Sequence, residues 1–347
     1  MSRLQTMATA PVIVIAFLTA VLLAAPGCGG VAPAADAEAA ATSGGRASAT
    51  PAATSLPASE LTSYRRVGYD KSFKADLIDA LPSPPELVVL GGSRARRFAP
   101  SDLSRATGLS AFNCAVQCFR PEDAYAFSRY LFDKAPDQRL RCVIALQTRT
   151  FNDDQMRAGL LHDERLSRAF PAGLVEEQRA TLGTPPVKDL LVASRFLPRG
   201  FLEENAYDVT RAKPQYAFSR HMDLYIRRLL PNHSWNGPLD AQRSREYFEK
   251  TMRLYNDHDV IPLVVIMPYQ PKALRAFRAA GFQKHLDVLT SYLRDARTRC
   301  DFRVLDLVDI SSFGGSPRAF YDGAHVAREN TRRIVRHAVR AAPECFR

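Results

Sequence analysis

The chain has 347 residues, of which 46% are hydrophobic, so it can bury the core of one large domain or two small ones. Its formal net charge of +11 raises nucleic acid, an anionic membrane or an acidic glycan as partners. The basic residues are scattered, however, without a long Lys/Arg block, zinc-finger spacing or an RNA-binding aromatic motif. We therefore exclude nucleic acid as a partner and interpret Arg94–Arg97 and Thr331–Arg340 as solvated helix faces.

The N-terminal segment has the pattern of an export signal. The apolar run Pro11–Ala25 follows Arg3. It is shorter than the roughly 20 residues that a spanning helix needs, and it suits the hydrophobic region of a signal peptide. Cys28 follows Ala25–Gly27, which resembles a bacterial lipobox with Ala and Pro at unusual places. We predict a signal peptide over residues 1–28 with Cys28 as the candidate lipidation site; a simple signal peptide and a short uncleaved anchor are the alternatives.

A spacer is expected to separate this signal from the folded body. Residues 29–60 are rich in Ala, Ser, Thr and Pro and contain almost no large apolar side chain. Such a segment cannot bury enough surface to offset the entropy of ordering, so we predict disorder. The body would then span residues 61–347 and belong to an exported protein, either anchored to the cell membrane through lipid or secreted.

The cysteines favour thiols over a disulfide framework. Lipidation of Cys28 would leave an odd number in the body. We expect buried or free thiols, with Cys300 and Cys345 as the one candidate pair. No metal site is expected, because Cys114 and Cys118 lack CxxC spacing and the histidines are dispersed.

In the body, short apolar runs alternate with helical patterns, which predicts a parallel sheet covered on both faces. The predicted strands are Glu86–Gly92, Ser110–Val116, Arg141–Thr148, Val260–Pro268 and Phe302–Val308. The best-marked helices are Arg120–Ala135, Asp240–His258, Lys272–Thr298 with a break at Gly281, and Glu329–Ala342. The expected fold is a three-layer α/β/α, doubly wound, flavodoxin-like domain of about five parallel strands. Such sheets hold their sites at the carboxyl ends of the strands.

An insertion of about residues 151–240 interrupts this alternation. Leu160–Phe170, Leu174–Leu182 and Val187–Leu197 are predicted to be short helices, so the insertion should be mainly helical. It could form a lid or a wall over a site, or it could be structural decoration. The sequence leaves both interpretations open.

Three polar residues fall where such a sheet would bring them together. Ser93 follows Gly91 and Gly92 at the end of the first strand, and Asp322 and His325 precede the last helix. A serine hydroxyl becomes a nucleophile when a histidine takes its proton, and a carboxylate can hold that histidine in one tautomer. Individually, these patterns also fit a plain turn and a capping Asp beside a surface His. Their placement predicts one active site.

The sequence also resembles a known family. "VVLGGSRARRF", "FNCAV" and "YDGAH" are similar to the first, second and last blocks of SGNH hydrolases (GDSL-like esterases), particularly the secreted bacterial branch with polysaccharide O-acetyltransferases and acetyl esterases. The likeness runs from about Glu86 to Ala341. It implies Ser93 as nucleophile, His325 as general base and Asp322 as its orienting partner, without a metal or organic cofactor.

The chain departs from the family pattern around the oxyanion hole. Gly92 stands where the family has Asp, Ala115 replaces the glycine of the second block, and the third block is not recognisable. The candidate donors to the oxyanion are the N–H groups of Ser93 and Ala115 and the side chains of Asn113 and Gln147. Tyr269 and Gln270 could line the acyl or sugar pocket, or merely shape a turn bounded by prolines.

The expected function is an extracytoplasmic serine ester hydrolase that acts on small acyl esters, such as O-acetyl groups of a cell-surface glycan, through a Ser-His-Asp acyl-enzyme. Two alternatives remain: a polysaccharide O-acetyltransferase, and a non-catalytic envelope protein that keeps the fold and binds a glycan or partner. The degenerate second and third blocks favour the binding protein. The retained Ser, Asp and His oppose it.

Overall fold

The structure, a computed structural model, describes residues 63–67, 70–152, 156–182, 188–196, 199–200, 202–204, 217–232 and 239–347. The expected export signal, Cys28 and the spacer lie outside these residues. Among the described helices, none is both long and apolar enough to cross a membrane.

The body is organised around an open five-stranded parallel sheet, as the alternation of apolar runs predicted. Its strands, in spatial order, are β3 (Ala111–Asn113), β2 (Leu87–Gly91), β4 (Arg141–Leu146), β7 (Leu263–Ile266) and β8 (Arg303–Asp306). This is the flavodoxin-like order, in which the direction of winding reverses between the first and third strands along the chain. The reversal falls between β2 and β4, and doubly wound sheets hold their sites at the carboxyl ends of the strands beside such a point.

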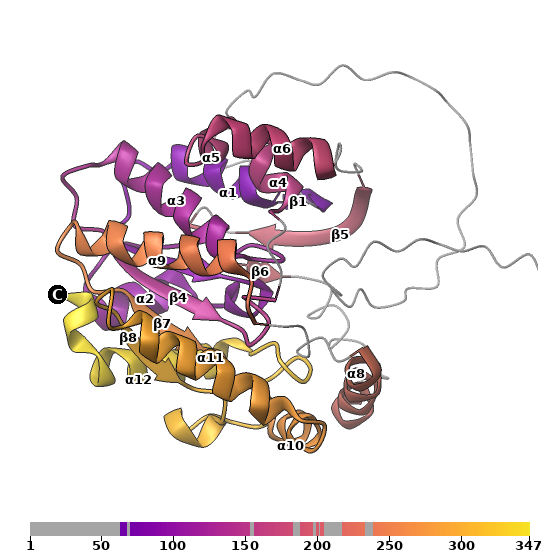
Figure 1. Ribbon diagram of the computed structural model, residues 1–347. Coiled ribbons are helices and arrows are strands. Elements are labelled where there is room, and N and C mark those ends of the chain that lie inside the picture. Colours follow the sequence, from indigo (N-terminus) through magenta and orange to yellow (C-terminus); the bar gives the residue numbers. More distant parts are fainter. Residues whose placement is uncertain are drawn as a thin grey trace, which may run out of the picture. The chain divides into compact units, whose positions relative to one another are not determined.

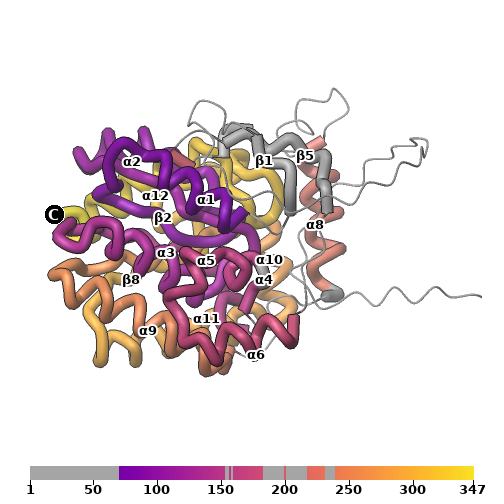
Figure 2. The backbone as a smooth tube through the Cα atoms, turned by 90° about the horizontal axis from the view of Figure 1, so that it is seen from above, coloured from indigo at the N-terminus to yellow at the C-terminus, as the bar shows by residue number. Residues whose placement is uncertain are grey.

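Helices cover both faces of the sheet, which confirms the three-layer fold (Figures 1 and 2). One layer contains α1 (Asp70–Asp79), α3 (Pro121–Lys134), α9 (Gln242–Asn256), α10 (Pro271–Ala279) and α11 (Phe282–Ala296). The opposite layer contains α2 (Pro100–Thr107), α12 (Arg328–Ala341) and the short helices η2 (Ile310–Phe313) and η3 (Pro343–Phe346). Along β2, Val88 and Leu90 are buried toward the first layer, and Leu87 and Val89 toward the second. A strand buried on both faces must be apolar throughout, which is why these runs were recognisable.

The insertion differs from the prediction, because it contributes a second sheet. Its helices are α4 (Ala158–Leu161), α5 (Glu164–Ser167), α6 (Ala172–Leu182) and α8 (Phe218–Asn232). The segment predicted as a helix at Val187–Leu197 instead forms β5 (Lys188–Phe196). This strand pairs antiparallel with β1 (Ser63–Val67) and β6 (Leu202–Glu204). The helix prediction was wrong because the pairing partner β1 lies more than a hundred residues upstream, beyond any local pattern.

The described cysteines form no disulfide with one another. Cys114, Cys142, Cys300 and Cys345 are buried, and Cys118 is half-buried. The expected pair between Cys300 and Cys345 is therefore wrong, whereas the expectation of buried thiols is confirmed. Burial raises the pKa of Cys345 to about 12, so this thiol stays protonated.

A buried lysine fastens the insertion to the edge of the sheet. Lys74 of α1 donates from Nζ to the Asn113 carbonyl at 2.7 Å and to the Gly200 carbonyl. The side chain is completely buried, and burial lowers its pKa from 10.5 to about 7. Between these values the unfolded chain binds a proton that the folded chain does not, so stability rises with pH.

We expect this titration to appear in unfolding experiments. The free energy of unfolding of the wild type, minus that of Lys74→Met, should rise by about 2 kcal/mol between about pH 7.5 and about pH 9.5. Urea denaturation at both pH values measures it, with Lys250→Met, an exposed lysine beside Glu246, as the control. A difference that does not vary with pH would mean that Lys74 stays protonated in the folded chain.

Candidate active site

Ser93, His325 and Asp322 form one continuous chain of hydrogen bonds. Ser93 Oγ lies 2.9 Å from His325 Nε2, and His325 Nδ1 lies 2.7 Å from Asp322 Oδ2. The serine is half-buried, the His325 side chain is 22% exposed and that of Asp322 is 1% exposed. Ser93 and His325 are thus partly open to solvent, whereas the carboxylate of Asp322 is buried.

The fold delivers the serine by its first strand. β2 ends at Gly91, and Ser93 opens the short helix η1 (Ser93–Ala95) directly beyond it. Gly91 is needed for close packing, because a methyl group added there would lie 2.9 Å from the Cβ atom of Ala145 on β4. Ser93 therefore stands at the carboxyl edge of the sheet, where doubly wound folds hold their sites.

The histidine comes from a loop that closes on itself. Tyr321 N–H donates to the His325 carbonyl at 2.8 Å, and Phe320 and Val326 form an antiparallel bridge. Asp322 Oδ1 accepts the His325 N–H at 2.8 Å inside this closed loop. The aspartate fixes both the backbone and the imidazole of His325, which explains why the two residues stand three apart.

The electrostatics of Asp322 favour its charged form. Burial alone would raise the pKa of this carboxyl, but His325 and the backbone N–H groups of Ala324 and His325 hold it below the ordinary 3.8. The carboxylate therefore stays ionised at neutral pH. By linkage its ionisation stabilises the folded state above pH 3.8, and this contribution is lost as the pH falls through the lowered value.

Among the candidate oxyanion donors, the Gln147 side-chain amide lies close to the turn that carries Ser93. Gly91 pairs with Ala145, and Ser93 and Gln147 each lie two residues beyond that pair. A methyl group added at Gly92 would lie only 2.7 Å from Gln147 Nε2. The Ser93 N–H, at the start of η1, has no acceptor within that helix. The Ser93 N–H and the Gln147 side-chain amide thus both lie just beyond the carboxyl ends of β2 and β4.

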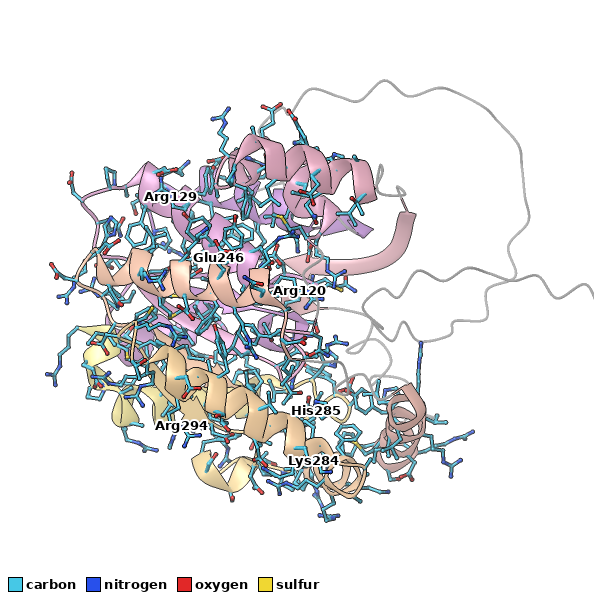
Figure 3. All side chains as sticks on the ribbon, viewed as in Figure 1. Arg120, Arg129, Glu246, Lys284, His285 and Arg294 are labelled. Carbon is cyan, nitrogen blue, oxygen red and sulfur yellow. The ribbon has the colours of Figure 1, made fainter. Side chains whose placement is uncertain are left out.

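A tight turn fixes the backbone of Gln147. The Gln147 N–H donates to Thr150 Oγ1 and the Thr150 N–H donates to the Gln147 carbonyl, both at 3.0 Å. Arg120, labelled in Figure 3, is buried and donates from Nη1 to the Thr150 carbonyl at 3.1 Å. No third block of the family is recognisable here, yet these contacts fix the backbone from which the Gln147 side chain projects.

The other two oxyanion candidates are engaged elsewhere. Asn113 donates from Nδ2 to the carbonyls of Ala95 at 3.0 Å and Phe98 at 2.8 Å. Its Oδ1 accepts the Ala115 N–H at 2.8 Å, and both residues are fully buried. The Asn113 side chain thus braces the segment after Ser93, and neither group points a free donor at the site. The expectation that they bind the oxyanion is not supported.

Tyr269 and Gln270 also have structural roles instead of lining a pocket. The Tyr269 ring packs edge-on against Phe277 at 5.5 Å and Phe282 at 5.2 Å, within the aromatic core. The side chain of Gln270 caps α10 by accepting the N–H of Lys272 at 2.6 Å. A residue directly before Pro and a helix is a common cap position, so this signal was present in the sequence.

Arg94 and Tyr225 are two residues near the site that the sequence did not reveal. Arg94 was assigned to a solvated face together with Arg97, but both side chains are buried. Tyr225 of α8 lies against the His325 loop, since a methyl group at Gly323 would approach its ring to 2.4 Å. This contact makes α8 a wall beside the site, which favours the wall interpretation of the insertion. No local sequence signal distinguishes either residue from an ordinary surface arginine or core tyrosine.

The sequence was compared with known proteins. No protein-family model matches it, and no curated protein matches it either.

Proposed function

We propose that this protein is a serine hydrolase of small acyl esters that works through a covalent acyl-enzyme on Ser93. The observation that carries the proposal is the hydrogen-bonded series from Ser93 Oγ through His325 to Asp322, at 2.9 and 2.7 Å. A hydroxyl, an imidazole and a buried carboxylate in this order are the arrangement that activates a serine. The substrate class, O-acetyl esters of glycans, rests on the resemblance to SGNH hydrolases.

The geometry supports the following acylation step. Ser93 Oγ attacks the ester carbonyl carbon while its proton passes to His325 Nε2, and the carbonyl π electrons move to oxygen. The Ser93 N–H and the Gln147 amide stabilise this oxyanion. When the carbonyl re-forms, the bond to the alcohol oxygen breaks and that oxygen takes the proton from His325.

Deacylation repeats these moves with water. A water molecule gives a proton to His325 Nε2 as it attacks the acyl carbonyl, and the bond to Ser93 Oγ breaks. The serine oxygen then regains the proton. Asp322 remains charged throughout and stabilises the imidazolium formed in each half-reaction, because its carboxylate faces Nδ1.

Covalent labelling tests the proposal. The body of the protein is incubated with a fluorophosphonate probe, and the modified peptide is identified by mass spectrometry. We expect labelling on Ser93 that is abolished in Ser93→Ala and His325→Ala, together with hydrolysis of p-nitrophenyl acetate. A wild-type protein that neither labels nor hydrolyses the ester would contradict catalysis and favour the glycan-binding or partner-binding alternative.

The contribution of Gln147 can be measured by a double-mutant cycle. Gln147→Ala should lower kcat by about 10²- to 10³-fold, because one oxyanion donor is lost. Gly92→Ala should lower kcat comparably. The added methyl group would lie only 2.7 Å from Gln147 Nε2 and would displace the amide. In the Gln147→Ala background the second substitution should then have little further effect.

The control for this cycle is Gln138→Ala, a half-buried glutamine in the loop before β4 that should leave kcat unchanged. Independent, multiplicative losses from Gly92→Ala and Gln147→Ala would show that the glycine serves some purpose other than admitting the amide.

A further inference from the structure

The residue after the nucleophile makes contacts that its position alone would not predict. Arg94 shares η1 with Ser93, and its side chain is only 3% exposed. Its Nε donates to the carbonyl of Ala324 at 3.0 Å, and its Nη2 donates to the carbonyl of Pro268. One side chain thus joins the nucleophile turn, the end of β7 and the loop that carries His325.

Both backbone polar groups of Ala324 are consequently hydrogen-bonded. The Ala324 N–H donates to Asp322 Oδ1 at 2.8 Å, and the Ala324 carbonyl accepts from Arg94. Ala324 immediately precedes His325, so the orientation of its backbone sets where the imidazole projects. The Gly323 carbonyl beside it accepts the Gln270 N–H at 3.0 Å. Of these ties, only Arg94 comes from the segment that carries the nucleophile.

The guanidinium is held by contacts other than an ion pair. It lies over the Tyr269 ring, 4.1 Å from the centroid, which is a cation–π distance. Its described partners are two carbonyl oxygens and this ring, and Nη1 is buried without a hydrogen-bond partner among the described residues. Burying a guanidinium without a carboxylate is costly, so a packing role alone would be better filled by an apolar side chain.

We propose that Arg94 is a positioning residue, which locks the Ser93 turn to the His325 loop and so sets the distance between Ser93 Oγ and His325 Nε2. The proposal rests on the proposed function, because it assigns a partner to the same site. Lysine cannot replace the arginine, since an ammonium has neither the planar fork that reaches two carbonyls nor the same stacking on Tyr269.

The kinetic test uses Arg94→Met and Arg94→Lys, with p-nitrophenyl acetate as substrate. We expect both variants to lower kcat by about 10²-fold, the effect of a small misplacement of reacting groups, with KM changed by less than about twofold. In Arg94→Ala, millimolar methylguanidinium should restore part of the lost rate, as a purely structural defect would not. Arg245→Met is the matched control, because Arg245 also stacks on a ring, at 4.7 Å from Tyr292, and donates to a backbone carbonyl.

A second readout does not depend on turnover. The proton between His325 Nδ1 and Asp322 should give a far-downfield NMR resonance in the wild type, and Arg94→Met should shift or broaden it, whereas Arg245→Met should not. This separates failure of the proposal from failure of the proposed function, because the resonance can be followed even if no ester is hydrolysed. Unchanged kcat and resonance in a folded Arg94→Met, or equal losses in the Arg245→Met control, would overturn the assignment. If Arg94→Met does not fold, Arg94→Lys is judged by the same criteria.

Discussion

Replacing Ser93 with alanine is expected to lower kcat/KM for p-nitrophenyl acetate by about 10⁴- to 10⁶-fold, because no other described group is placed to form the acyl-enzyme. His325→Ala should cause a loss of similar size, since the hydroxyl at 2.9 Å would have no base. The two residues act as a unit, so the double variant should be only slightly worse than either single one. Stopped-assay kinetics on purified variants measure all three.

The matched control for this experiment is Ser101→Ala. Ser101 is an exposed serine on α2 and takes no part in the series of hydrogen bonds at the site, so its loss should leave the rate unchanged. Multiplication of the single losses in the double variant would mean that Ser93 and His325 act independently, against the mechanism. Residual hydrolysis equal to that of the wild type would place the nucleophile elsewhere.

Asp322→Asn should lower kcat by about 10³- to 10⁴-fold while the fold is kept. Oδ1 of Asp322 accepts the N–H groups of Ala324 and His325, both at 2.8 Å. Asparagine can satisfy them only by turning its oxygen toward the backbone, which directs its NH₂ group at His325 Nδ1. The imidazole must then accept at Nδ1 and carry its proton on Nε2. It can no longer take the proton of Ser93.

Because the defect is one of tautomer, Asp322→Asn should still fold, and its thermal melting should fall only by the contribution that the ionised carboxylate makes to stability. Asp309→Asn is the control, because Asp309 caps η2 by accepting the Ser311 N–H at 3.1 Å and does not contact His325. The pKa of Asp322 lies below 3.8, so any loss of wild-type activity at pH values well above this must come from another group. Activity of Asp322→Asn within tenfold of the wild type would show that the carboxylate does not select the tautomer.

The central strands of the sheet could be predicted from the sequence because they are buried on both faces. Runs such as Leu87–Gly91 and Leu263–Ile266 have to be apolar at every position, whatever their neighbours are. β5 is different, since Lys188–Phe196 mixes polar and apolar residues and depends on β1 for its hydrogen bonds. A strand that depends on a distant pairing partner has no local sequence pattern that marks it, and this is why β5 was predicted to be a helix.

The same distinction applies to the site. Ser93, Asp322 and His325 could be found because strand ends and loop order place them at one edge of the sheet. The donors around them could not, because the sequence does not say which amide is already bonded. The Asn113 amide binds the carbonyls of Ala95 and Phe98, whereas the Gln147 amide lies beside Gly92. The burial of an arginine is equally hidden when its acceptors lie 174 and 230 residues further along the chain.

The sequence separation between the two halves of the dyad has a consequence for biosynthesis. Ser93 and His325 are 232 residues apart, and the loop that carries the imidazole follows the last strand of the sheet. A nascent chain synthesised only as far as β8 would therefore contain Ser93 but neither the imidazole nor the carbonyl of Ala324 that Arg94 binds. Truncation of the chain before Phe320 should therefore abolish the proposed ester hydrolysis, because His325 and Asp322 would both be lost.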